Sequence, residues 1–73
     1  MDIETIHESL VNGQRRQMVE QIDEYGLYAF WRDYVNFLDR VFFYTGALEA
    51  AGLKEMNAFL SDAVISYHRI KNR

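Results

Sequence analysis

The run from Leu27 to Tyr44 constrains the fold most, because it is apolar on too many sides for a surface helix. Projected at about 100° per residue, its apolar side chains cover an arc of roughly 200°. A helix on the surface of a globule needs an apolar stripe of only about 100°. We therefore expect this helix to be covered on more than one side. Either it is the central helix of a small bundle, or a second copy or another protein seals part of its arc.

Three other runs have helical spacing, and no segment alternates with a period of two. They cover residues 3–11, residues 14–25, and residues 53 to about 71. The first run starts after Asp2 or at a capping box from Thr5 to Glu8. Proline is absent, and each glycine (Gly13, Gly26, Gly46 and Gly52) follows a helix-compatible run, where a left-handed residue ends a helix well. The sequence predicts an all-α fold, a compact bundle of three to four helices with an aromatic-rich central helix, in one domain over residues 1–73.

Catalytic and cofactor sites find little support in the sequence. The two histidines, His7 and His68, lie near opposite ends of the chain, and no pair of potential metal ligands has helical metal-site spacing. The glycines are isolated, so no phosphate-binding loop is present. Acidic pairs such as Asp23 and Glu24 are typical of a solvated face. We expect a protein that is not an enzyme and needs no metal or cofactor.

The absence of a signal-peptide pattern, of a long apolar run and of cysteine indicates the cellular location. Residues 1–10 carry three acids and no basic residue, unlike a signal peptide, and no apolar run approaches the roughly 18 residues that cross a bilayer. Cysteine is absent, which fits a reducing compartment. We expect a cytoplasmic protein that makes no membrane contact.

Charge is spread unevenly along the chain, whose net charge is −3. Residues 20–62 hold eight acids against three bases, which weighs against nucleic-acid binding by the body of the protein. An acidic middle instead suits a basic surface on a partner protein. The residues expected to contact that partner are aromatic, acidic or apolar positions outside the core: Phe43, Tyr28, Asp39, Glu49 and Ile65.

Two arginines, Arg15 and Arg16, stand in the first turn of a predicted helix, where the helix dipole disfavours cations. In one interpretation Arg15 crosses to a carboxylate of another helix, Glu4, Glu8 or Asp33, while Arg16 points toward Glu20 and Asp23. In the other interpretation both arginines bind an anion at the helix start.

The second interpretation leads to a helix-turn-helix-like DNA-binding regulator as the alternative function. Its nucleic-acid contacts would be Arg15, Arg16 and the basic tail residues Arg69, Lys71 and Arg73. The acids of the same helix, Glu20, Asp23 and Glu24, would face phosphates unfavourably.

Two segments, "IHESLVNGQRRQMVEQIDEYGLYAFW" and "DAVISYHRIKNR", resemble small orphan proteins of bacterial phages, plasmids and integrative elements. The likeness covers about half of the chain, at its two ends. It carries over no catalytic or binding residue, because that group has no assigned activity. It implies an accessory protein of a mobile element, such as an inhibitor of a host defence system of the anti-CRISPR or anti-restriction type that binds a host protein. A homodimer with its seam on the aromatic helix is a further expectation.

Overall fold

Four helices make up the fold of this computed structural model: α1 (Ile3–Val11), α2 (Arg15–Tyr25), α3 (Leu27–Tyr44) and α4 (Ala50–Lys71). The structure describes residues 2–44 and 50–72, and the side chains of residues 2–41 and 54–72. No strand occurs in these ranges. The all-α prediction is therefore confirmed, and the observed bounds of the second and third helices lie within one residue of those predicted.

Local chemistry explains where the first two helices begin and end. Asp2 caps α1, because its carboxylate accepts a hydrogen bond from the Thr5 backbone N–H at 2.9 Å. This selects the earlier of the two predicted starts. Gly13 and Gly26 follow α1 and α2 with φ of +76° and +99°, a conformation that glycine adopts at little cost. Both turns are therefore set by glycine, as the sequence predicts.

The start of the last helix differs from the prediction. We expected a break at Gly52 and a helix from Leu53, but α4 begins at Ala50 and continues through Gly52. A single glycine inside a helix costs only about 1 kcal/mol relative to alanine, which the remaining turns of a long helix offset. Gly46, the other glycine expected to end a helix, lies outside the described residues.

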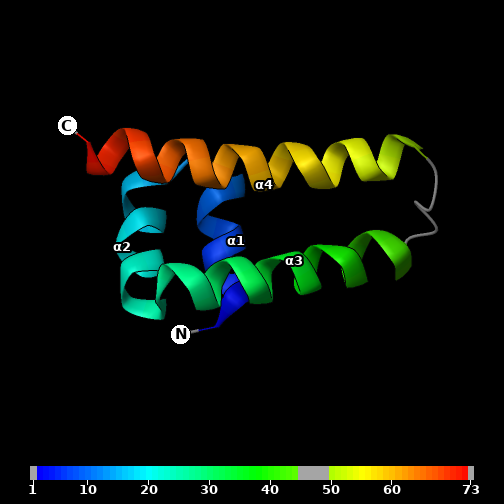
Figure 1. Cartoon of the computed structure of the whole chain (residues 1–73), viewed down its shortest axis with the longest axis horizontal. Coiled ribbons are helices and arrows are strands. Elements are labelled where there is room, and N and C mark those ends of the chain that lie inside the picture. Colours follow the sequence, from blue (N-terminus) through cyan, green and yellow to red (C-terminus); the bar gives the residue numbers. More distant parts are fainter. Residues whose placement is uncertain (1, 45–49, 73) are drawn as a thin grey trace.

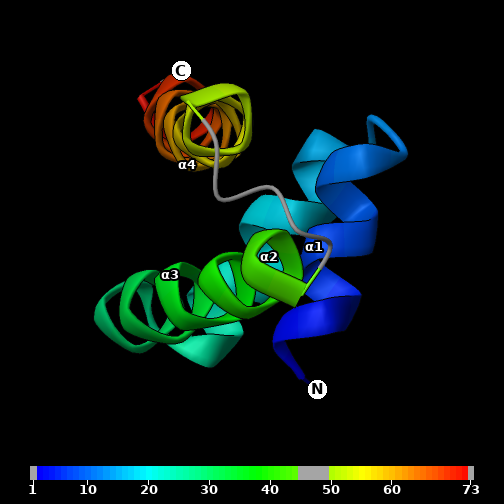
Figure 2. The ribbon, with the colours of Figure 1, turned by 90° about the vertical axis from the view of Figure 1, so that its right-hand side faces the viewer.

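The two long helices, α3 and α4, run antiparallel along the long axis of the molecule (Figure 1). The two short helices, α1 and α2, pack on one side of this pair (Figure 2). α3 contacts all three other helices, and so does α2. The buried apolar core draws on all four helices: Ile6, Leu10, Met18, Val19, Ile22, Phe30, Tyr34, Leu38, Leu60 and Ala63.

Cover of the α3 arc is incomplete, however. Phe30, Tyr34 and Leu38 form the stripe that is buried against the other helices. Other apolar members of the same arc stay exposed: Leu27, Tyr28, Trp31 and Val41. Among the described residues the other helices therefore cover only the inner part of the arc, and the alternative that a second copy or another protein seals the outer part stays a prediction.

Candidate functional site

An exposed apolar surface lies where the start of α3 faces the second half of α4. We call it the α3–α4 patch and define it by Leu27, Tyr28, Trp31, Val64 and Ile65. The side chain of Tyr28 is 80% exposed, that of Ile65 51% and that of Trp31 43%. Two shallow grooves meet here, and Trp31 and Val64 line both of them. Such a gathering of exposed apolar side chains marks a surface that a partner can cover.

The helical repeat of α4 explains why its patch residues face away from the core. Leu60, Ala63 and Ser66 form its buried stripe. Val64 and Ile65 follow Ala63 by one and two residues, so they rotate by about 100° and 200° away from that stripe. The groove-lining residues of α4 share this outer side: Asn57, Ser61, Val64, Ile65 and His68, together with the edge of Leu60.

The lining of the two patch grooves contains no Lys, Arg, Asp or Glu. Arg32, one turn after Tyr28, places its Nε 3.0 Å from a carboxylate oxygen of Asp33. That carboxylate also accepts a hydrogen bond from the Tyr25 hydroxyl. The hydrogen bonds from Arg32 and Tyr25 hold the pKa of Asp33 below its usual range. The patch is therefore uncharged, and the nearby guanidinium already has a carboxylate partner.

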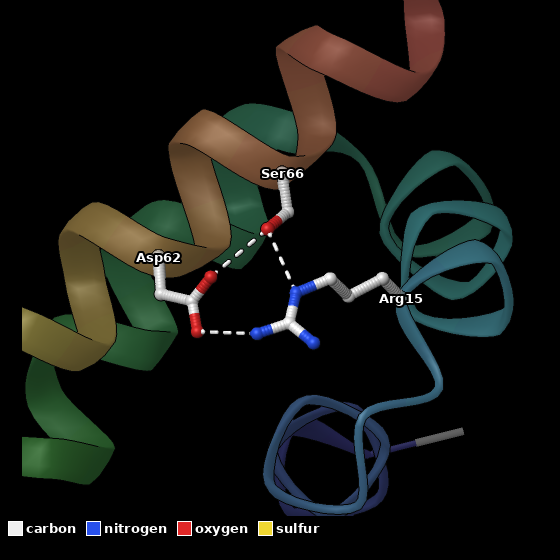
Figure 3. Close-up of polar contacts among 3 residues, drawn as sticks. All are labelled: Arg15, Asp62 and Ser66. Carbon is white, nitrogen blue, oxygen red and sulfur yellow. Dashed lines mark hydrogen bonds and ion pairs between the residues drawn. The ribbon is translucent and has the colours of Figure 1, made fainter.

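Arg15 belongs to a closed polar cluster between α2 and α4 (Figure 3). Its Nη2 donates to Asp62 Oδ2 at 3.0 Å and its Nε donates to Ser66 Oγ at 3.2 Å. Ser66 in turn donates to Asp62 Oδ1 at 2.9 Å. The prediction of an internal partner for Arg15 is confirmed, but the three named carboxylates (Glu4, Glu8 and Asp33) are wrong. The partner is on α4, because the α2 face that carries Arg15 packs against that helix.

A second polar link joins the end of α2 to α4. Asp23 accepts hydrogen bonds from Lys71 Nζ at 2.8 Å and from the Tyr67 hydroxyl at 2.7 Å. These two hydrogen bonds lower the pKa of Asp23, and the bond from Lys71 has the larger effect. Lys71, a nucleic-acid contact only under the alternative function, therefore has an internal partner. The same link explains why Arg16 does not pair with Asp23.

A basic groove lies beside the Arg15 cluster, and Arg16 and Arg69 line it together with Arg15. Within the described residues neither Arg16 nor Arg69 has an ion-pair partner, so Arg16 forms no ion pair with Glu20. Asp62 is the acid in this groove, and it already neutralises Arg15. Arg16 and Arg69 therefore give this groove two guanidiniums without an ion-pair partner among the described residues, where an anion would meet them.

An acidic groove lies between the start of α1 and α3. Three acids, Asp2, Asp33 and Asp39, line it together with one base, Arg40. Asp39, one of the expected partner contacts, is exposed there. Of the other residues expected to make contacts, Glu49 and Arg73 lie outside the described residues, and the side chain of Phe43 does as well.

His7 is the one histidine that packs inside the bundle. Its Nδ1 shares a hydrogen bond of 2.8 Å with the Tyr34 hydroxyl. The imidazole also contacts the rings of Phe37 and Phe59. Burial lowers the pKa of His7, and burial likewise raises the pKa of Tyr34. The half-buried imidazole therefore joins α1 to aromatic side chains of α3 and α4.

No group of three or more His, Asp or Glu side chains is arranged to hold a metal ion in residues 2–44 and 50–72. In those ranges no helix combines the length and the apolar character that crossing a bilayer requires.

Sequence reasoning missed the place where the expected contact residues gather. It placed Trp31 and Leu27 in the apolar arc without separating the buried side from the open one. It named Tyr28 and Ile65 separately, whereas the structure brings them to one surface with Val64 and Trp31. The signal in the sequence was the width of the arc, which exceeds what three neighbouring helices cover.

Comparisons with protein-family models, with curated proteins and with solved structures return no match to this chain.

Proposed function

We propose that this chain is a non-enzymatic module that acts by protein–protein contact. The observation that carries the proposal is the α3–α4 patch, in which a tyrosine that is 80% exposed stands beside a half-exposed tryptophan. Aromatic side chains of this kind dominate binding energy at protein interfaces, and charged residues are depleted from the centres of such interfaces. The patch has both properties, because no Lys, Arg, Asp or Glu lines its grooves.

The target that we propose is a host protein with a basic surface, such as a nucleic-acid-binding component of a defence system. The net charge of −3 and the acidic groove of Asp2, Asp33 and Asp39 support this choice. Opposite charge speeds and orients encounter. The resemblance to proteins of mobile elements supports a cytoplasmic inhibitor that occludes its target.

A pull-down from host cytosol with the tagged full chain tests the proposal. Mass spectrometry should find an enriched protein with the unmodified chain and a reduced amount with the double variant Tyr28→Ser/Ile65→Ser or with Asp39→Lys. Val11→Ser is the matched control, because Val11 is an exposed apolar residue outside the patch. Enrichment of nucleic acid without protein would contradict the proposal.

A DNA-binding regulator is the second candidate, and the basic groove with Arg16 and Arg69 favours it. Against it, Arg15 and Lys71 are already held by Asp62 and Asp23. Retention on heparin at low salt that is lost in the variant Arg16→Ala/Arg69→Ala would support this candidate. Elution of the unmodified chain without retention would exclude it.

A further inference from the structure

The basic groove lies between the start of α2 and the second half of α4, and it shares one residue, Ile65, with the α3–α4 patch. Three arginines line it, Arg15, Arg16 and Arg69, against one acid, Asp62. We propose that this groove binds a phosphate group, which is supplied as free phosphate or by a mononucleotide. The inference goes beyond the proposed function, because it concerns a different surface and a small ligand.

Two guanidiniums of the groove are left without a carboxylate. The chain has eleven acidic residues against eight basic ones, so an arginine has more potential partners than competitors. Nevertheless neither Arg16 nor Arg69 forms an ion pair within the described residues, and both are exposed. The residues one turn before Arg69 on α4 are Ile65 and Ser66, which offer no carboxylate. An anion from outside the chain therefore meets both guanidiniums without displacing an internal ion pair.

The acid of the groove does not compete for these two arginines. Asp62 Oδ2 accepts a hydrogen bond from Arg15 Nη2 at 3.0 Å, and its Oδ1 accepts one from the Ser66 hydroxyl at 2.9 Å (Figure 3). The bond to Asp62 also holds the Arg15 guanidinium in the wall of the groove.

Arg15 keeps one guanidinium nitrogen available. Its Nη1 makes no hydrogen bond within the described residues, because Nη2 and Nε are the atoms that contact Asp62 and Ser66. A Cβ built on Gly13, another lining residue, would stand 3.9 Å from Nη1, so the glycine leaves room beside this donor. Arg15 can therefore add a third donor group to a ligand that Arg16 and Arg69 bind.

The chemistry of the guanidinium group selects phosphate as the ligand. A guanidinium is planar and donates parallel hydrogen bonds that match the oxygens of a phosphate. A phosphate monoester carries a charge of about −1.5 to −2 at neutral pH and has three acceptor oxygens, so several arginines can share it. A carboxylate carries a single charge and has two oxygens. Phosphate therefore fits a groove with three arginines better than an acidic side chain does.

The small extent of the basic surface favours a single phosphate over duplex DNA. A protein whose DNA binding depends strongly on salt makes on the order of 6–10 phosphate contacts. The groove offers three arginines, and α2 continues beyond it with the exposed acids Glu20, Asp23 and Glu24. A duplex that extends along α2 would meet these carboxylates, whereas a single phosphate contacts the groove alone.

Amide NMR spectra of the isotope-labelled full chain test the inference. The probes are inorganic phosphate and AMP, and sodium chloride at matched ionic strength is the reference. Both probes should give saturable shifts at Gly13, Arg16 and Arg69, with a dissociation constant on the order of 1 mM at low salt, because each exposed ion pair contributes little. Raising salt from about 0.02 to about 0.2 M should weaken binding severalfold, because the guanidiniums are exposed to screening.

Substitutions locate the site. Arg16→Gln/Arg69→Gln should raise the dissociation constant for both probes at least about tenfold. Arg40→Gln/Lys54→Gln is the matched control, because it removes two positive charges from outside the groove and should bind as the unmodified chain does. Circular dichroism should remain helical in both double variants, since all four side chains are exposed.

The two probes distinguish the sources of the phosphate. AMP that binds at least about threefold more tightly than inorganic phosphate would support the groove as a mononucleotide site. Equal affinities would support a site for the phosphate group alone.

Absence of saturable shifts up to about 20 mM phosphate, or an unchanged dissociation constant in Arg16→Gln/Arg69→Gln, would overturn the inference. A short DNA duplex that binds through these two arginines at least about tenfold more tightly than AMP would also overturn it, and would support the DNA-binding regulator. The protein–protein proposal fails separately, because this variant keeps every side chain of the α3–α4 patch. A chain that binds phosphate but captures no host protein refutes the proposed function, and the reverse result refutes the phosphate site.

Discussion

His7 of α1 and Tyr34 of α3 share a hydrogen bond of 2.8 Å inside a group of aromatic rings. Tyr34 is fully buried, so its hydroxyl would lack a partner without the imidazole. A buried polar group that loses its partner costs about 1–3 kcal/mol. The pair therefore fixes the contact between the first helix and the central one, although the two residues are 27 positions apart.

Acid should weaken the fold through His7. Burial holds the pKa of His7 below its usual value of 6.5, against the smaller opposing effects of Glu8 and Glu4. As pH falls below about 6.5 the unfolded chain takes up this proton before the folded chain does, so stability falls until the folded pKa is passed. Above that window His7 contributes no pH dependence.

The measurement is urea unfolding of the unmodified chain and of His7→Gln at pH 7.5 and at pH 5. Both proteins lose stability when the carboxylates that are common to both become protonated. The unmodified chain should lose more stability than His7→Gln between the two pH values. Equal losses in the two proteins would show that His7 is not the titrating group.

Arg15→Lys should destabilise the fold by about 0.5–1 kcal/mol, because an ammonium cannot reproduce the guanidinium fork that reaches both Asp62 and Ser66. Arg16→Lys is the matched control, since Arg16 has no ion-pair partner in the described residues. Its effect should stay within about 0.5 kcal/mol. Urea unfolding at neutral pH compares the two, and equal effects would remove the cluster as a source of stability.

Ser9→Ala should cost about 1–3 kcal/mol. The Ser9 hydroxyl donates to the Gln21 side-chain oxygen at 2.7 Å, and both residues are buried between α1 and α2. The single substitution leaves the amide oxygen without this donor. Thermal unfolding of Ser9→Ala, Gln21→Met and the double variant forms a cycle that should show coupling between the two positions. Strictly additive effects would contradict the assignment.

Asp2→Ala should destabilise α1, because the variant loses the acceptor for the Thr5 N–H. Asp2→Asn should retain most of the stability, since an amide oxygen also caps a helix. Urea unfolding at neutral pH distinguishes the two variants. Equal losses would indicate that the charge of Asp2 matters more than its hydrogen bond.

The sequence alone predicted the helices, but it did not predict which part of each helix surface is buried and which part is exposed. The helical spacing and the glycines placed three of the four helices, because those signals are local in the chain. Gly52 misled the prediction, since one glycine does not end a helix whose neighbours pack well. The partners of Arg15 and Lys71 lie 47 and 48 positions away, so no local pattern could identify them. The open part of the α3 arc likewise depends on how many helices surround it.

The two links between α2 and α4 together set the roll of the last helix about its own axis. Asp62 is held on one flank of its buried stripe, Ser66 is held within the stripe, and Tyr67 and Lys71 are held on the other flank. Because both flanks of α4 are hydrogen-bonded to α2, rotation of α4 about its axis would break these bonds. The bonds therefore keep Ile65 exposed and keep the charged Arg69 from taking its place. The ends of a short helix on the far side of the bundle thus decide which side chains the protein shows to its surroundings.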